Sequence, residues 1–377
     1  MYFKMKLFDV YSLFDVTPIK AKDVYVYDDA GNEYLDLYGG HAVISVGHSH
    51  PHYVENIKSQ LDKISFYSNS VKNPLQSVLA EKINEHADLE DYQLFLCSSG
   101  AESIENALKL ASFHTNKKRV IAFKNSFHGR TSAAVAVTDN HKISSPLNKQ
   151  QNVTFLKLDD YENLEIELKK GDVCAVIFET IQGVGGLDMP KGDFICYMDR
   201  LCKQYGTCLI ADEVQSGFSR SGKFFAYQFN NIEPDIITMA KGMGNGFPVG
   251  GILINSKIKP SVGLLGTTYG GNHLACIASI SVLDILKNQN LQKNASSLES
   301  YFKNSINSMN ICKVKGKGLM LGLEFDFEVS ELRKKLVYEK RIFTGSSSNK
   351  NLIRILPPLT INKKHLNIFF DALKDIL

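Results

Sequence analysis

The middle of the chain alternates short apolar runs with longer amphipathic segments. Seven runs of four to six residues are rich in Val, Ile and Phe: residues 93–97, 119–123, 153–156, 173–178, 207–211, 235–239 and 250–254. Because these runs are continuously apolar, they predict strands that are covered on both faces. Segments between several of them, such as residues 102–114 and 194–205, carry apolar residues at helical spacing. This alternation predicts an α/β fold built on a mainly parallel, seven-stranded sheet flanked by helices.

Both ends of the chain have a different pattern. Residues 24–27 and 34–37 flank an Asp/Gly turn and predict a hairpin, and a helix is expected over residues 75–87. The C-terminal part mixes expected helices and strands: residues 274–287 and 291–306 for the helices, 319–325 and 353–356 for the strands. We therefore predict a large domain and a smaller α+β domain formed by both termini: residues 49–270 for the large domain, 1–48 and 271–377 for the small one.

Composition excludes several classes of protein. The chain has 377 residues, of which 44% are apolar and 22% charged, the balance of a globular protein. A net charge of +3 is too small to indicate a nucleic-acid surface, and no apolar run is long enough to span a bilayer. The N-terminal residues lack the apolar segment of a signal peptide, and the seven cysteines form no CxxC pair. We therefore expect a cytoplasmic enzyme with reduced thiols and with neither a nucleic-acid nor a membrane partner.

Two candidate ligand-binding features follow predicted strands, which is where open parallel sheets bind their ligands. Residues 98–101 (Ser-Ser-Gly-Ala) form a small turn before an expected helix, and the free N–H groups of such a turn can hold a phosphate. The same kind of turn also occurs where only close packing is needed. Asp212 ends an apolar strand, where a carboxylate is costly to bury unless it meets a cation or caps a helix.

Two further features carry a cation. Lys241 follows an apolar strand and precedes a turn with three glycines, and a desolvated amine at such a place can attack a carbonyl group. Phe127 and Arg130 follow another strand and offer an aromatic face and a carboxylate-binding guanidinium. Each feature alone also fits a surface charge or an ion pair. Together the four describe a flat, phosphorylated ligand that has a basic ring nitrogen and forms an imine, which is the chemistry of pyridoxal 5′-phosphate (PLP).

Five motifs make a family recognisable. They are Ser99-Gly100-Ala101-Glu102, Phe127-His128-Gly129-Arg130-Thr131, Asp212-Glu213-Val214-Gln215, Lys241-Gly242 and residues 266–272 (Gly-Thr-Thr-Tyr-Gly-Gly-Asn). On these motifs the chain resembles the class III aminotransferases of PLP fold type I, most closely the acetylornithine aminotransferases, over essentially its whole length. Any one motif could arise by chance, but all five in this order make the resemblance specific.

The resemblance implies roles for the residues around the cofactor ring. Lys241 matches the Schiff-base lysine, which also acts as the base for the 1,3-proton shift. Asp212 would pair with the pyridinium nitrogen and keep it protonated, and Gln215 would bond the ring 3′-oxygen. Phe127 and Val214 would lie against the two faces of the ring.

The resemblance also implies how the phosphate is held. Ser99, Gly100 and Ala101 would bind it through backbone and hydroxyl donors. Thr268 is similar to the family's threonine that reaches the phosphate of the neighbouring subunit's cofactor. This last role requires a homodimer with shared active sites.

Substrate binding is implied by a further set of residues. Arg130 matches the arginine that takes the distant carboxylate of N-acylornithine, and Arg354 matches the one that takes the α-carboxylate of glutamate or 2-oxoglutarate. Thr267 lies where the family has a substrate-contacting Ser or Thr. Gly40 leaves room for an acyl group, near the point where ornithine aminotransferases carry a tyrosine. We expect His41 either to meet a polar or anionic acyl group or to be an ordinary hydrogen-bonded histidine.

The function so implied is transfer of the δ-amino group of N-acetylornithine or N-succinylornithine to 2-oxoglutarate through a PLP Schiff base, in arginine biosynthesis. One departure from the family lies in residues 179–184 (Glu-Thr-Ile-Gln-Gly-Val). Where the family has a second glutamate, which screens the glutamate-binding arginine while an ω-amino donor is bound, this chain has Val184. Because a valine cannot screen Arg354, we predict that α-amino acids compete more easily as donors.

Three other functions stay open at this point. Another ω-aminotransferase, for ornithine, 4-aminobutyrate or a diamine, would share nearly every residue above. A PLP-dependent aminomutase would work without 2-oxoglutarate, and a non-catalytic scaffold would keep a vestigial site. The histidines of residues 48–52 (His-Ser-His-Pro-His) alternate, but they have no Cys or carboxylate partner nearby in the sequence, so we expect helix capping there and no metal.

Overall fold

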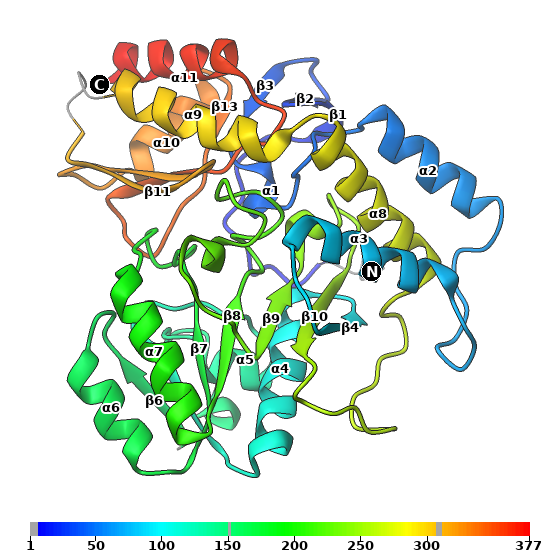
Figure 1. Ribbon diagram of the computed structural model, residues 1–377. Coiled ribbons are helices and arrows are strands. Elements are labelled where there is room, and N and C mark those ends of the chain that lie inside the picture. The colour runs from blue at the N-terminus through cyan, green and yellow to red at the C-terminus, as the bar shows by residue number, and fades with distance from the viewer. Residues whose placement is uncertain (1–6, 150–151, 307–310) are drawn as a thin grey trace, which may run out of the picture.

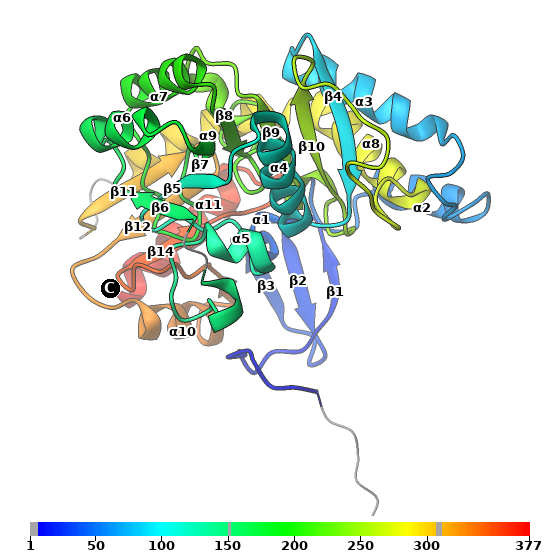
Figure 2. The same ribbon diagram turned by 90° about the horizontal axis from the view of Figure 1, so that it is seen from below.

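A seven-stranded sheet forms the centre of the protein (Figures 1 and 2). The computed structural model describes residues 7–149, 152–306 and 311–377. The expectation about a signal peptide concerns in part residues 1–6, which lie outside the described residues. The strands lie in the order β4 (Tyr92–Cys97), β10 (Gly250–Asn255), β9 (Ile236–Met239), β8 (Cys208–Asp212), β7 (Val173–Phe178), β5 (Arg119–Phe123) and β6 (Val153–Leu156). Strand β10 runs antiparallel to both neighbours, and the other four pairings are parallel. The predicted mainly parallel sheet is confirmed.

Helices cover both faces of this sheet, which explains why β7 is apolar throughout its length. Successive side chains of a strand point to opposite faces. Val176 and Phe178 belong to one apolar core and Ala175 and Ile177 to the other. The core of Ala175 is closed by α4 (Gly100–Thr115) and α5 (Ser132–Ala136), and that of Val176 by α3 (Pro74–Ala87), α6 (Tyr161–Lys169), α7 (Gly192–Tyr205) and α8 (His273–Asn288).

Two smaller sheets lie above the main sheet in the view of Figure 1. The first contains the predicted hairpin, whose strands pair antiparallel, and it joins the two ends of the chain: β1 (Pro18–Lys22), β2 (Tyr25–Asp28), β3 (Glu33–Asp36) and β13 (Ile342–Phe343). The second is antiparallel: β11 (Lys313–Lys317), β12 (Met320–Glu324) and β14 (Leu352–Ile355). The helices around them are α9 (Leu291–Ile306), α10 (Ser330–Tyr338) and α11 (Lys363–Ile376). The domain boundaries given above stay a prediction.

The remaining elements are short or connect these layers. Helix α2 (Pro51–Leu61) packs against α8, and α1 (Gly39–Ala42) follows the first small sheet. Three 3₁₀ turns complete the described elements: η1 (Pro146–Asn148), η2 (Ala226–Phe229) and η3 (Lys241–Met243). Within residues 7–149, 152–306 and 311–377, none of the helices is both long enough and apolar enough to cross a membrane.

Candidate active site

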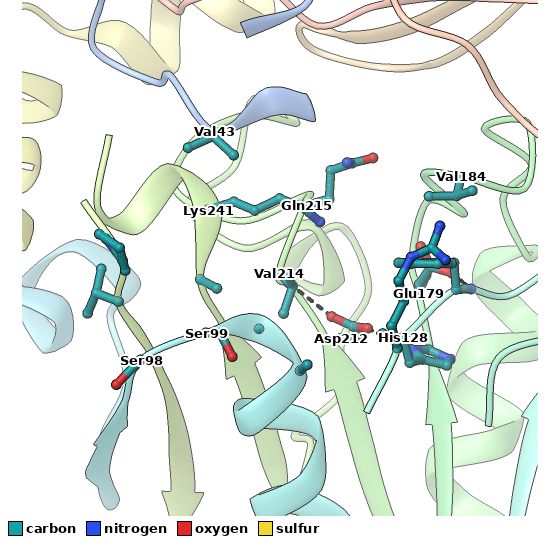
Figure 3. Close-up of a pocket in the computed structure, with 18 of the residues that line it drawn as sticks. Val43, Ser98, Ser99, His128, Glu179, Val184, Asp212, Val214, Gln215 and Lys241 are labelled. Carbon is teal, nitrogen blue, oxygen red and sulfur yellow. Dashed lines mark hydrogen bonds and ion pairs between the residues drawn. The ribbon is translucent and has the colours of Figure 1, made fainter. Parts of the chain in front are cut away.

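The carboxyl ends of β4, β5, β7, β8 and β9 meet at one edge of the main sheet, and a cavity of about 460 Å³ opens there (Figure 3). The structure brings nine of the predicted site residues into its wall: Ser99, Gly100, Ala101, Phe127, Arg130, Asp212, Val214, Gln215 and Lys241. Ser98, the first residue of the predicted phosphate-binding turn, also lines it, whereas no role was predicted for Val43, His128 and Glu179.

The N-terminus of α4 forms one wall of the cavity. Ser99 is its N-cap residue, and its Oγ accepts the N–H of Glu102 (3.2 Å). The N–H groups of Gly100 and Ala101 belong to the first helical turn, where no preceding carbonyl is available to accept them. A Cβ on Gly100 would lie 2.8 Å from Val214 Cγ1, so only glycine leaves this turn open. The arrangement is an anion cradle with free N–H donors and the positive end of a helix dipole.

Lys241 enters the cavity directly after β9. Its backbone has a φ of +46°, a left-handed conformation that non-glycine residues rarely adopt. Figure 3 shows the side chain extended toward Gln215, and Nζ makes no hydrogen bond or ion pair with the part of the chain that the structure describes. Burial lowers the pKa of Lys241, and the positive charge of Arg354 acts in the same direction, whereas Asp212 opposes them. An amine of this kind can lose its proton and act as a nucleophile.

Asp212 ends β8 and is held from several sides. Its Oδ1 accepts hydrogen bonds from Val214 N (3.0 Å) and Thr238 Oγ1 (3.1 Å), and its Oδ2 lies 2.6 Å from His128 Nδ1. Burial disfavours the charged imidazole of His128, but the bond to Asp212 and the charges of Asp212 and Glu179 outweigh it, so the pKa of His128 is raised. The buried carboxylate of Asp212 thus has an imidazole partner and stays within reach of a ligand in the cavity.

Glu179 follows β7 and is the second buried acid of this edge. Its Oε1 accepts the N–H of Phe127 (2.9 Å), and its Oε2 accepts that of Gly183 (2.9 Å). Burial raises the pKa of Glu179 to about 7. The rule that singled out Asp212, an acid at the end of an apolar strand, applies equally to Glu179 and could have found it. His128 carries no such signal, because its partner is 84 residues away.

Arg354 lies outside the cavity wall but bonds to it. Its side chain is 2% exposed, and its Nη1 donates to Gly183 O (2.9 Å) and Gln215 Oε1 (3.3 Å), while Nε donates to Ser346 O. Within the described residues it has no carboxylate partner. Burial lowers the pKa of Arg354. A guanidinium that is buried with neutral oxygens alone is suited to receive an anion.

The turn that carries Gly40 has an unusual backbone. Four consecutive residues have positive φ: Gly39 (+55°), Gly40 (+54°), His41 (+68°) and Ala42 (+63°). Asp36 holds the entrance of the turn because its Oδ1 accepts the N–H of Gly39 (2.8 Å). Gly40 is exposed and is not part of the cavity wall, and a Cβ on it would meet no atom within 4 Å, so there is open space beside this residue.

His41 touches the cavity through its backbone. Its carbonyl oxygen accepts a hydrogen bond from Gln215 Nε2 (3.2 Å), and its ring bonds to the hydroxyl of Tyr38. Partial burial and the charges of Arg354 and Lys241 lower the pKa of His41 to about 4, so the ring is neutral at pH 7. Of the two expectations for this residue, the geometry matches the hydrogen-bonded histidine.

Two predicted residues lie away from the cavity in this single chain. Thr267 lines a different cavity of about 490 Å³ together with Leu94 and Gly270, and its Oγ1 accepts the N–H of Gly270 (3.0 Å). Thr268 is exposed on the same loop. The chain alone therefore does not bring them to Lys241.

The alternating histidines have separate partners. His48 Nε2 lies 2.8 Å from Asp36 Oδ2, and His52 Nε2 lies 3.6 Å from Asp284 Oδ2. His50 precedes α2, but its side chain makes no capping hydrogen bond, so the capping prediction is wrong for it. In the described ranges no group of three His, Cys, Asp or Glu side chains has a metal-binding arrangement.

The side chains of the cavity fit PLP. An anion cradle, an amine without a partner and a paired carboxylate correspond to its phosphate, aldehyde and ring nitrogen, while Phe127 and Val214 offer apolar surfaces for the ring. The sequence model of the family "Aminotransferase class-III" matches residues 10–377. The chain belongs to the class III aminotransferases. Enzymes of this class depend on PLP, so the protein is a PLP-dependent aminotransferase of fold type I.

Named relatives of this class III aminotransferase cover nearly the whole chain. The acetylornithine aminotransferase of Aquifex aeolicus (strain VF5) is 38% identical over 98% of this chain and 99% of its own length. That of Bacillus subtilis (strain 168) is 37% identical over 98% and 97%. The crystal structure of the ornithine aminotransferase from Toxoplasma gondii ME49 has a TM-score of 0.90 at 25% identity, covering 97% of this chain and 92% of that one.

The turn of residues 39–42 depends on Asp36, which gives a testable expectation. In Asp36→Ala the N–H of Gly39 and the imidazole of His48 lose their buried acceptor, so the free energy of unfolding should fall by about 1–3 kcal/mol. Urea unfolding measures this change. Asp29→Ala, an exposed aspartate next to the same hairpin, is the control and should change little. Equal losses in both variants would contradict the role given to Asp36.

Proposed function

We propose that this class III aminotransferase transfers the δ-amino group of an N-acylornithine, acetylated or succinylated, to 2-oxoglutarate in arginine biosynthesis. The observation that carries the proposal is a pair of guanidiniums, Arg130 and Arg354, that have no carboxylate partner within the described residues. The acylornithine carries a carboxylate distant from its δ-amine, and 2-oxoglutarate and glutamate carry an α-carboxylate beside the reacting carbon. A guanidinium binds either carboxylate through two parallel hydrogen bonds. The names of the relatives at 37–38% identity support the same substrate.

We infer the following roles around the cofactor. When bound, PLP supplies an electron-withdrawing ring that stabilises negative charge at the carbon that loses a proton. Lys241 Nζ would hold the aldehyde carbon and, once released by substrate, would move that proton. Asp212 would keep the ring nitrogen protonated, because its bond to His128 stabilises the buried negative charge. Gln215 would bind the 3′-oxygen.

The remaining walls would position the ring. Phe127 and Val214 would flank its faces, and the N–H groups of Gly100 and Ala101 with the hydroxyl of Ser99 would bind the phosphate. These contacts fix the ring so that Lys241 meets the reacting carbon from one side.

Arg130 and Arg354 would bind the two substrates in turn. Arg130 would take the distant α-carboxylate of the acylornithine, and Arg354 would take the α-carboxylate of 2-oxoglutarate or glutamate. The open space beside Gly40 supports an acylated substrate, because an acyl group needs room that a larger side chain would fill. The likeness to an ornithine aminotransferase supports free ornithine as the second candidate, since its structure matches over nearly the whole chain.

We propose that the enzyme acts as a homodimer with shared sites. Thr268 would then reach the phosphate in the partner subunit, and Thr267 would contact its substrate. Exposed apolar side chains near the N-terminus support such a partner: Leu7, Phe8, Tyr11 and Leu13. A cytoplasmic location is also proposed, and the seven free cysteines support it.

Covalent trapping tests the role of Lys241. Borohydride should attach PLP to Lys241, found by peptide mapping, and Lys241→Ala should lose the label and about 10³-fold or more of the transamination rate. Because the amine reacts only when neutral, labelling of the apoenzyme should fall as pH drops through the lowered pKa of Lys241, below the usual value near 10.5. Lys257→Ala is the control and should keep the label. A labelled Lys241→Ala protein would contradict this role.

Donor kinetics test the substrate. With 2-oxoglutarate as acceptor, kcat/KM for N-acetyl- or N-succinylornithine should exceed that for free ornithine by about tenfold or more, if recognition of the donor includes its acyl group as proposed. Comparable values for all three would withdraw the acylornithine assignment. Product formed beyond one equivalent of enzyme without 2-oxoglutarate would indicate an aminomutase instead, because an aminotransferase stops after a single half-reaction.

Val184→Glu tests the effect of the missing acid. A carboxylate near Arg354 should lower the ratio of α- to ω-donor rates roughly fivefold, as for an ion pair of about 1 kcal/mol. Val184→Gln is the control of equal length without charge and should leave the ratio nearer to that of the unchanged enzyme. An unchanged ratio in Val184→Glu would sink the prediction that Arg354 is unscreened.

A further inference from the structure

Glu179 contacts two loops that serve different ends of the cavity. Its Oε1 binds the backbone N–H of Phe127, in the loop that walls the cavity after β5. Its Oε2 binds the N–H of Gly183, whose carbonyl oxygen accepts a hydrogen bond from Arg354 Nη1 (2.9 Å). One carboxylate therefore ties the loop beside the cofactor ring to the loop that holds the guanidinium. Figure 3 shows Glu179 between Val184 and His128.

Both connections are short and buried. Glu179 is 7% exposed and has no ion-pair partner in the ranges that the structure describes, so its two oxygens depend on these N–H groups. Gly183 packs closely against Gln215, because a Cβ at this position would lie 2.0 Å from Gln215 Oε1. Gln215 in turn accepts a bond from Arg354. A change at Glu179 would therefore be transmitted to Arg354.

We propose that Glu179 is a positioning residue for both ends of the site, holding the backbones of Phe127 and Gly183 at a fixed separation so that the cofactor ring and the substrate carboxylate are placed together. The inference rests on the proposed function for the carboxylate that Arg354 receives. A carboxylate is suited to the task because its two oxygens accept hydrogen bonds in different directions.

Glu179→Gln tests this inference on the holoenzyme at pH 8, where the native side chain is mostly ionised. The amide keeps the length of the side chain but offers one acceptor oxygen, and its NH₂ group opposes one of the two N–H donors. We expect PLP release to accelerate about tenfold and the Kd for glutarate, a dicarboxylate without an amino or keto group, to rise about tenfold. Gel filtration follows PLP release, and the absorbance of bound PLP reports glutarate; neither measurement needs turnover.

Variants that act on one end provide the reference. Phe127→Leu should accelerate PLP release alone, and Arg354→Lys should weaken glutarate binding alone. Asp235→Asn is the matched control for stability: Asp235 is a buried carboxylate that accepts the N–H of Leu209 (2.6 Å) at the opposite end of the sheet. It should lower the Tm and leave both ligand measurements unchanged.

A joint loss in Glu179→Gln supports the inference. A change at one end only, or no change at either end with a Tm loss like that of Asp235→Asn, overturns it. If Glu179→Gln does not fold, Glu179→Asp is measured instead, because it keeps both oxygens but is one methylene too short, and the same joint loss is expected. If the unchanged holoenzyme binds no glutarate, the proposed function fails and the inference with it; if it does bind glutarate, only the inference is at stake.

Discussion

Because β4, β5, β7, β8 and β9 all run in one direction, every loop that leaves their carboxyl ends starts at the same edge of the sheet. The strands themselves are apolar on both faces, so the first polar residue after each strand is forced to this edge. A five-residue strand is about 16 Å long at roughly 3.3 Å per residue, and reversing β8 would move Asp212 away from Lys241 by a comparable distance. The direction of the strands thus decides which side chains share a cavity, before any single contact contributes.

Charges at this edge are satisfied to different degrees. Asp212 has an imidazole partner, Glu179 has two backbone donors, and Arg354 has only neutral oxygens. Lys241 has no partner among the described residues and sits on a strained backbone. Charged groups without a partner of opposite charge are costly in a protein interior, so a ligand of complementary charge that binds in the cavity would stabilise the fold.

The sequence predicted the main sheet well because its signal is local. Continuous apolar runs placed strands such as β5 and β7 at their observed bounds. The acid that ends β8 and the amine that follows β9 were visible as polar residues after such runs. Strand β1 is mostly exposed, and β13 has two residues, so neither has a periodicity to detect. The pairing of His128 with Asp212, the backbone partners of Glu179 and the left-handed turn near Gly40 arise from tertiary contacts and could not be read from spacing.

The left-handed turn has a consequence for altering the enzyme's range of substrates. A side chain at Gly39 would meet Leu356 O at 2.8 Å, whereas one at Gly40 would enter open space. Asparagine and aspartate tolerate a positive φ better than other non-glycine residues. Substitutions in this turn are therefore best confined to Gly40 and His41 and chosen from such residues. In a library of variants that also replaces Gly39, the turn of residues 39–42 would be distorted in most members.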